Sequence, residues 1–178
     1  MKGVIFTEFV EFVEERYGFD TADEILVDEK GEDRIFTQAG NYPFDDLVAV
    51  ITTLCKVENI ELKEVLYYFG EYLFERLAKM ASFLIEGSTS SFDLISKVDS
   101  YIHIEVKKLY PDADLPKFKV HSQSDTVLEM EYQSEKRLEE LGKGLMSGCA
   151  KFFNENVDIT YHIESEDPHT SIFRIEKL

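Results

Sequence analysis

The spacing of apolar residues predicts a helical N-terminal half. Residues 1–17 and 45–58 each place apolar side chains on one face of a helix and polar side chains on the other. Residues 62–80 are apolar almost all round, which predicts a helix that is buried on most of its surface. We expect a short acidic helix at 21–28 and a longer helix at 92–109, which ends before a proline.

The pattern changes after residue 110, where apolar and polar residues begin to alternate. Four short runs have the period of strands: 118–121, 126–132, 157–163 and 171–176. A helix over 136–153 separates the two pairs, and the polar segment 164–169 is predicted to be a hairpin loop. This order predicts an α+β fold, in which a four-stranded antiparallel sheet and its helices follow the helical half in a single domain, residues 1–178.

Composition and charge exclude several classes of protein. The 178 residues include 19 Lys+Arg and 36 Asp+Glu, a net charge of −17, and 44% are hydrophobic. The hydrophobic content excludes a disordered acidic tail, and the charge disfavours binding to nucleic acid or to an anionic membrane. No apolar run reaches the roughly 18 residues that span a bilayer, and no signal peptide is evident. We therefore expect a soluble cytoplasmic protein.

His103 lies in the predicted helix at 92–109, between two isoleucines. One interpretation is a half-exposed helical histidine with satisfied hydrogen bonds. The other is an axial metal ligand, because a neutral imidazole on a rigid helix offers one ring nitrogen to a metal. No other histidine or cysteine lies three or four residues away, so this helix alone does not build a zinc site. A single histidine is sufficient where a macrocycle supplies the remaining ligands, as haem does.

A second candidate site follows the second predicted strand. Tyr132, Ser134, Lys136 and Arg137 place a phenol, a hydroxyl and two cations close together, which suits the binding of paired carboxylates. The alternative is an ordinary helix start with Ser134 as its N-cap.

Gly142, Gly144 and Gly148 fall within the helix predicted next in the chain. Each glycine destabilises a helix interior by roughly 1 kcal/mol relative to alanine, so a compensating contact is expected. Close approach of another helix and close approach of a flat ligand both satisfy this pattern, and the spacing does not decide between them.

The other histidines offer weaker candidates. His121, His162 and His169 lie near strand ends and are predicted to be surface residues. His162 and His169 could share a metal across the hairpin loop, but no third ligand is nearby. No phosphate loop, nucleophile–base order or carboxylate dyad is present, so we expect a protein that is not an enzyme.

Together these features resemble one family, the haem–nitric oxide/oxygen binding (H-NOX) domains, of the standalone bacterial type related to the sensor domain of soluble guanylate cyclase. The resemblance covers the whole chain. It rests on five stretches in the family's order: Met1–Phe6, Phe69–Phe74, His103–Pro111, Leu115–Pro116 and Tyr132-x-Ser134.

The resemblance implies haem b held between the two halves of the chain, with His103 as the axial ligand of the iron. Tyr132 and Ser134 would bind the haem propionates, while Pro116 and Ile5 would press on the macrocycle. One departure concerns the signature arginine, whose position is taken by Lys136 and followed by Arg137. Lysine keeps the charge but loses the planar fork that binds carboxylates in two places, so Arg137 could substitute for it.

A second departure concerns gas selectivity. The tyrosine that oxygen-binding members use to hydrogen-bond dioxygen falls at Leu141, and the other expected pocket positions are also apolar: Leu73, Leu77 and Leu145. Leucine offers no donor, so the resemblance implies a sensor that binds nitric oxide and carbon monoxide and excludes oxygen. Output would pass in trans to a histidine kinase or to a diguanylate cyclase or phosphodiesterase. The alternative, a haem carrier or electron-transfer protein, requires a second protein ligand, which is not evident.

Overall fold

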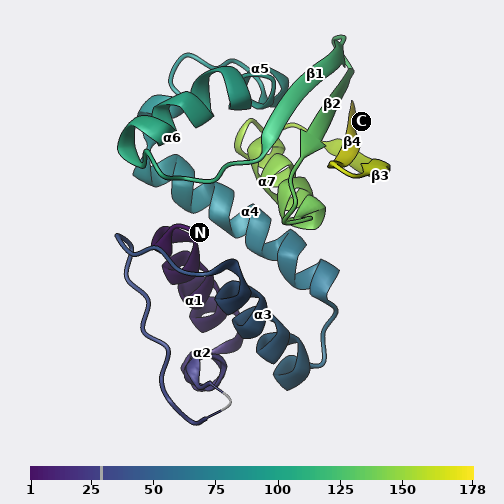
Figure 1. Cartoon of the computed structure of the whole chain (residues 1–178). Helices are drawn as coiled ribbons and strands as arrows, with labels where there is room; N and C mark the ends of the chain where they lie inside the picture. Colours follow the sequence, from purple (N-terminus) through teal and green to yellow (C-terminus); the bar gives the residue numbers. More distant parts are fainter. Residues whose placement is uncertain (29) are drawn as a thin grey trace. The chain divides into compact units, whose positions relative to one another are not determined.

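The computed structural model describes residues 1–28 and 30–178. Contacts within the chain group these residues into two compact units, Met1–Phe69 and Gly70–Leu178. The boundary lies inside one helix, α4 (Leu62–Met80), which Figure 1 shows as a continuous ribbon. The prediction of a single domain stays a prediction.

The first unit is helical, as predicted. It contains α1 (Gly3–Tyr17), α2 (Phe19–Leu26) and α3 (Phe44–Glu58), together with the first part of α4. Phe69 of α4 forms ring contacts with two buried rings of α1, at centroid distances of 5.0 Å to Phe9 and 5.6 Å to Phe12. Aromatic packing of this kind adds to the free energy of apolar burial and fixes the core of the unit.

The second unit is built on a four-stranded antiparallel sheet in the order β1-β2-β4-β3, which confirms the predicted sheet. Its strands are β1 (Lys117–Gln123), β2 (Val127–Gln133), β3 (Val157–Glu166) and β4 (His169–Lys177). β3 and β4 are longer than predicted, because most of the segment 164–169 continues the strand pairing. Only Asp167 and Pro168 remain to make the turn.

Helix α7 (Glu139–Phe152) covers one face of the sheet. Met146 and Cys149 of α7 share a buried core with alternate residues of β2 and with Phe173 of β4. The alternation predicted for β2 is confirmed, since Leu128, Met130 and Tyr132 are all buried on this face. Burial raises the pKa of the Cys149 thiol to about 12, so this cysteine is unreactive.

Glycines allow α4 and α7 to pack closely. A Cβ atom added to Gly70 of α4 would lie 2.8 Å from the Gly144 Cα atom, and one added to Gly148 would lie 2.9 Å from the Phe74 Cβ atom. The same contact is hydrogen-bonded, because the Ser147 hydroxyl donates to the Glu71 carboxylate at 2.7 Å. A neighbouring helix therefore accounts for the glycines in α7, apart from Gly142, which faces the sheet at Phe173.

Two predictions about helices are wrong in detail. α4 is less buried than predicted, because Leu62 at its start is 52% exposed and Met80 at its end is 51% exposed. The predicted helix at 92–109 is three shorter pieces: α5 (Ser91–Ile95), a π-helical turn η2 (Val98–Ile102) and α6 (His103–Leu109). A short 3₁₀ turn, η1 (Ser82–Leu84), precedes them. In the part of the chain that the structure describes, no helix is long and apolar enough to cross a membrane.

Candidate functional site

His103 is the first residue of α6, directly after the π-helical turn. Its Nδ1 atom lies 3.3 Å from the Asp99 carboxylate, four residues earlier, and Asp99 also accepts the Phe118 backbone N–H of β1 at 3.4 Å. This contact favours the tautomer with the proton on Nδ1 and leaves the Nε2 lone pair available. Among the described residues, Nε2 has no hydrogen-bond partner.

The protonation state of His103 also suits a metal ligand. The side chain is 15% exposed, and burial lowers the pKa of His103, although the Asp99 carboxylate opposes that effect. The imidazole is therefore neutral at pH 7.

The His103 ring lies 5.9 Å from the Phe118 ring, which in turn lies 5.3 Å from the Tyr132 ring. These ring contacts place His103 close to the end of β2, which carries Tyr132.

The segment between β2 and α7 presents two hydroxyls. The Tyr132 oxygen accepts the Leu138 backbone N–H at 3.3 Å, and the Ser134 hydroxyl accepts the Lys136 backbone N–H at 3.2 Å. Burial raises the pKa of Tyr132, so the phenol stays protonated and can donate. Helix α7 begins at Glu139 rather than 136, and its N-cap is Leu138. The interpretation of Ser134 as a helix N-cap is therefore wrong.

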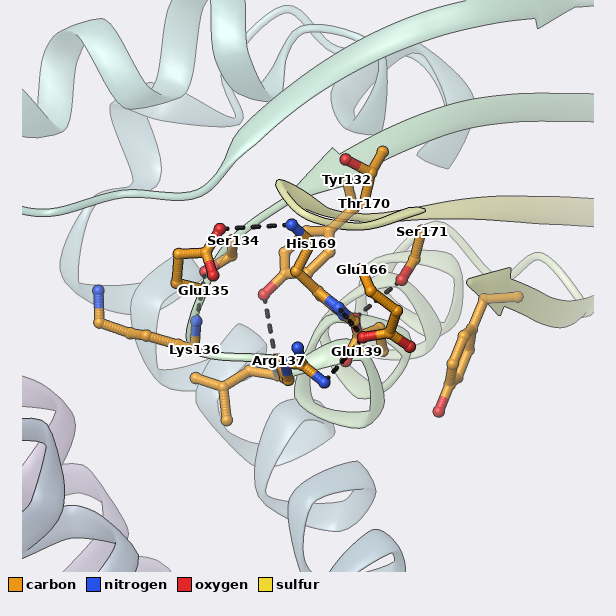
Figure 2. Close-up of polar contacts among 12 residues, drawn as sticks. Tyr132, Ser134, Glu135, Lys136, Arg137, Glu139, Glu166, His169, Thr170 and Ser171 are labelled. Carbon is orange, nitrogen blue, oxygen red and sulfur yellow. Dashed lines mark hydrogen bonds and ion pairs between the residues drawn. The ribbon is translucent and has the colours of Figure 1, made fainter. Parts of the chain in front are cut away.

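The two adjacent cations point to different places. Lys136 forms an ion pair with Asp114, and in Figure 2 its side chain extends away from the neighbouring polar cluster. The ammonium of Lys136 lowers the pKa of Asp114 through this contact. Arg137 has a left-handed backbone with φ of 51°, and its guanidinium lies 3.0 Å from the Glu166 carboxylate at the end of β3. Arg137 is therefore held against the hairpin, and Lys136 is held near the chain that leads to β1.

The apolar candidates lie on the two glycine-packed helices. Leu73 and Leu77 belong to α4, and Leu141 and Leu145 belong to α7, where the Gly70 contact falls beside Leu141 and Leu145. Leu73 and Leu141 are buried, and the other two are half-buried.

Two further candidates lie outside these helices. Pro116 is half-buried immediately before β1. Ile5 lies on α1 in the first unit, where it is also half-buried.

Sequence reasoning missed one cluster, which Figure 2 shows in full. His169 was predicted to be a surface residue, but it is 1% exposed, and its Nε2 atom lies 2.5 Å from the Glu139 carboxylate. The Ser171 hydroxyl donates to the same Glu139 oxygen at 2.8 Å. The neighbouring proline and acidic residues gave no signal of burial, because the partner of His169 lies 30 residues earlier in the chain.

The remaining candidates are surface residues, as predicted. His121 is exposed and lies 2.9 Å from the Glu131 carboxylate across β1 and β2, and His162 is 67% exposed. His162 and His169 therefore differ in exposure and in their partners. Among the described residues, no group of three or more metal-ligating side chains comes together.

The donor set fits one kind of cofactor. A neutral imidazole with a free nitrogen can supply one axial ligand, and phenol, hydroxyl and ammonium groups such as those nearby can bind carboxylates. A single axial donor cannot build a metal site alone, so the remaining ligands must come from the cofactor. An iron macrocycle with carboxylate side chains meets both conditions.

Comparisons with known proteins identify the family. The family model for haem-NO-binding proteins matches residues 2–161. A mutant of the K. algicida H-NOX protein with unliganded Fe(II) is 30% identical, with a TM-score of 0.91 over 100% of this chain and 97% of that chain. The Shewanella woodyi H-NOX protein in the Fe(II)CO state is 34% identical, with a TM-score of 0.84 over 100% of this chain and 95% of that chain.

A third H-NOX structure, from S. oneidensis in the Fe(II)NO state, is 25% identical, with a TM-score of 0.87 over 100% of this chain and 99% of that chain. No curated protein matches the sequence. These similarities confirm the predicted α+β fold, with its helical N-terminal half and its four-stranded antiparallel sheet.

Proposed function

Because the chain belongs to the haem-NO-binding (H-NOX) family of haem-based gas sensors, we propose that it binds nitric oxide and carbon monoxide, excludes oxygen and signals to a partner protein. Haem b, when bound, supplies a ferrous iron at which a diatomic gas can bind. The proposed role is sensing rather than catalysis.

The observation that carries this proposal is the environment of His103. Its imidazole is neutral, its Nδ1 atom is directed at Asp99, and its Nε2 atom is free to bind a metal. Asp99 orients the ring in the way that carboxylates orient metal-bound histidines. His103 would be the axial ligand, and its place at the start of α6 would couple it to the π-helical turn.

The carboxylates of the cofactor would be held by the segment between β2 and α7. Tyr132 and Ser134 would donate O–H groups, and Lys136 would supply the positive charge that the family's arginine provides. Lys136 is the better candidate of the two cations, because it occupies the position of the signature arginine, whereas the Arg137 guanidinium is paired with Glu166 at the end of β3. The cation would exchange its ion pair with Asp114 for one with a propionate.

Gas selectivity would follow from the leucines of α4 and α7. Dioxygen needs a hydrogen-bond donor to be retained as a ligand, whereas nitric oxide and carbon monoxide need one much less. Leu73, Leu77, Leu141 and Leu145 supply only apolar surface. They would exclude water and offer no donor to oxygen.

The output would pass to a separate protein. A histidine kinase, or a diguanylate cyclase or phosphodiesterase, is the class of partner that the family resemblance implies. With a net charge of −17, the chain would dock on a basic or neutral face of that partner, and the association would weaken as ionic strength rises.

One purification tests the proposal. The protein should carry haem, and its reduced absorption spectrum should change with nitric oxide or carbon monoxide but not with air on a short timescale. His103→Ala should lose the cofactor, and added imidazole should restore it. A colourless protein that takes up no haem would contradict the proposal, whereas a stable oxygen complex would contradict only the role of Leu141.

A further inference from the structure

Glu139, His169 and Ser171 form a polar cluster in the interior of the second unit. The Glu139 side chain is 9% exposed, His169 is 1% exposed and Ser171 is fully buried. One carboxylate oxygen accepts from both Ser171 and His169, at 2.8 and 2.5 Å. The His169 Nδ1 atom is buried without a hydrogen bond, and its nearest carboxylate, on Glu166, is 3.5 Å away. Such an unsatisfied buried nitrogen is costly and requires an explanation.

The cluster joins the hairpin to the segment that carries the proposed carboxylate-binding groups. The Ser134 backbone N–H donates to the His169 carbonyl at 3.2 Å, and the His169 backbone N–H donates to the Glu135 carboxylate at 3.3 Å. Arg137 adds its ion pair with Glu166 at the rim. Figure 2 shows these residues lying between the end of β2 and the start of α7.

The cluster also fixes the start of α7. Glu139 is the first residue of that helix, so its carboxylate ties the N-terminus of α7 to β4 through His169 and Ser171. Leu141, at the proposed gas site, is two residues further along the same helix. One buried carboxylate therefore connects the two segments that the proposed function assigns to propionate binding and to gas selectivity.

We propose that Glu139, His169 and Ser171 are positioning residues that hold the segment 132–138 in its cofactor-binding conformation. This inference rests on the proposed function and adds the residues that set how long the cofactor stays bound. Buried hydrogen bonds to a charged group are among the strongest in proteins, and removing one partner leaves the other unsatisfied. Loss of the cluster loosens the segment without removing any group that contacts the cofactor.

The experiment compares cofactor retention and local motion in two variants. Glu139→Gln removes the charge, and Ser171→Ala removes one donor while the strand stays intact. Haem loss is measured by transfer to excess apomyoglobin, and amide hydrogen exchange of Ser134 and Leu138 is measured on the haem-free protein. We expect haem loss to accelerate about tenfold for Glu139→Gln and about threefold for Ser171→Ala. Exchange of the two amides should accelerate in parallel, while the β1–β2 amides stay unchanged.

Two control variants separate positioning from general destabilisation. His121→Asn removes an exposed histidine–glutamate contact from the same sheet and should leave both measurements unchanged. Ile159→Val weakens the buried core of β3 without touching the cluster, and should shift the urea midpoint with little change in haem loss.

The possible results distinguish this inference from the proposed function. In both cluster variants, the rate of haem loss and the exchange rates of the Ser134 and Leu138 amides could stay within twofold of wild type. That result would overturn the positioning role and leave the haem proposal standing. Equal acceleration in Ile159→Val at a matched urea midpoint would also overturn it. If the wild-type chain bound no haem, the proposed function would fail, and unchanged exchange of Ser134 and Leu138 would still count against positioning.

Discussion

Adjacent residues in this chain can have unrelated partners, and Lys136 and Arg137 show why. The backbone between them turns into the left-handed region at Arg137, so the two side chains leave the segment in different directions. A lysine ammonium binds one carboxylate oxygen at a time, whereas a guanidinium can bind two. Lys136 therefore supplies the positive charge that would attract a haem propionate. It binds the propionate less firmly than an arginine would, because it lacks the second parallel hydrogen bond.

Lys136→Ala should therefore accelerate haem loss about tenfold, the effect of losing one charged hydrogen bond of about 1.4 kcal/mol. Arg137→Ala should have a smaller effect, because the signature arginine falls at Lys136 and the Arg137 guanidinium is directed at Glu166 of β3. Asp114→Asn should slow haem loss, since it removes the competitor for Lys136. Transfer to apomyoglobin measures all three, with exposed Lys119→Ala as the control. A larger effect of Arg137→Ala would show that Arg137 provides the clamp.

Leu141→Tyr tests gas selectivity at a single position. The variant places a phenol donor where the chain has an apolar side chain, and one such hydrogen bond can stabilise a ligand by about 1–2 kcal/mol. We expect the reduced variant to form a stable oxygen complex in air, which the wild type should not do. Leu141→Phe has the ring without the hydroxyl and should behave like wild type. A stable oxygen complex in both variants would point to ring size rather than to the donor.

The candidate residues differ in how far sequence could predict their surroundings. The burial of Tyr132 follows from the strand period predicted for 126–132, because that alternation is regular and local. His169 was not predicted to be buried, because its burial depends on a carboxylate 30 residues away. The pairing of Lys136 with Asp114, 22 residues earlier, is also invisible to spacing. Contacts between distant segments are what local patterns cannot encode.

The glycines of α4 and α7 mark the places where the two helices pack closely. Alanine at Gly70 should lower the free energy of unfolding by about 2 kcal/mol, because its Cβ atom would overlap the backbone of α7. Alanine at Gly142 should raise it by up to about 1 kcal/mol, since its Cβ atom would meet Phe173 at an ordinary 3.5 Å. Urea unfolding measures both changes. Equal effects of the two substitutions would contradict the close packing of the two helices.

Element boundaries were harder to predict than element types. The segment 92–109 contains no proline or glycine, so nothing local interrupts its helical period, yet η2 divides it. Residues 136–138 also favour helix, but α7 starts later because the Leu138 N–H bonds Tyr132 and Arg137 adopts a positive φ. At the start of α7, the contact with the Tyr132 oxygen overrides the local preference of good helix-forming residues.

Glu155, in the loop after α7, links α5 to β4 and should make stability depend on pH. Ser91 at the start of α5 and Lys177 of β4 both donate to its carboxylate. Burial alone would raise the pKa of Glu155, but these hydrogen bonds outweigh that effect and hold the pKa below its usual value of 4.5. The contribution to stability is therefore complete at neutral pH and is lost as pH falls through the lowered pKa.

Glu155→Gln should lower the free energy of unfolding by about 1–3 kcal/mol at pH 7. The difference from wild type should shrink below pH 4.5, where the wild-type carboxylate becomes protonated. Urea unfolding at pH 7 and at pH 3 measures this, with exposed Glu176→Gln as the control. A difference that stayed constant across this range would mean that the charge of Glu155 is not what stabilises the fold.

At the scale of the whole molecule, the excess of carboxylates acts against compactness. A net charge of −17 on 178 residues produces repulsion that salt screens over a Debye length of about 10 Å at 0.1 M. We expect the urea midpoint to rise when sodium chloride increases from about 10 mM to about 300 mM, a range over which the Debye length falls severalfold. A midpoint that fell would show that ion pairs such as Arg174–Glu129 outweigh the repulsion.

The division of the chain at Phe69 and Gly70 has a consequence for attempts to dissect it. Proteases cut exposed linkers, but this boundary lies inside the hydrogen-bonded helix α4. We therefore expect limited proteolysis not to separate the two units. Cutting at this point would leave backbone N–H groups without partners on one fragment and carbonyl groups without partners on the other. Phe69 would become the last residue of one fragment, and Gly70 would become the first residue of the other. Each fragment would therefore end in helical backbone whose hydrogen bonds the cut has broken.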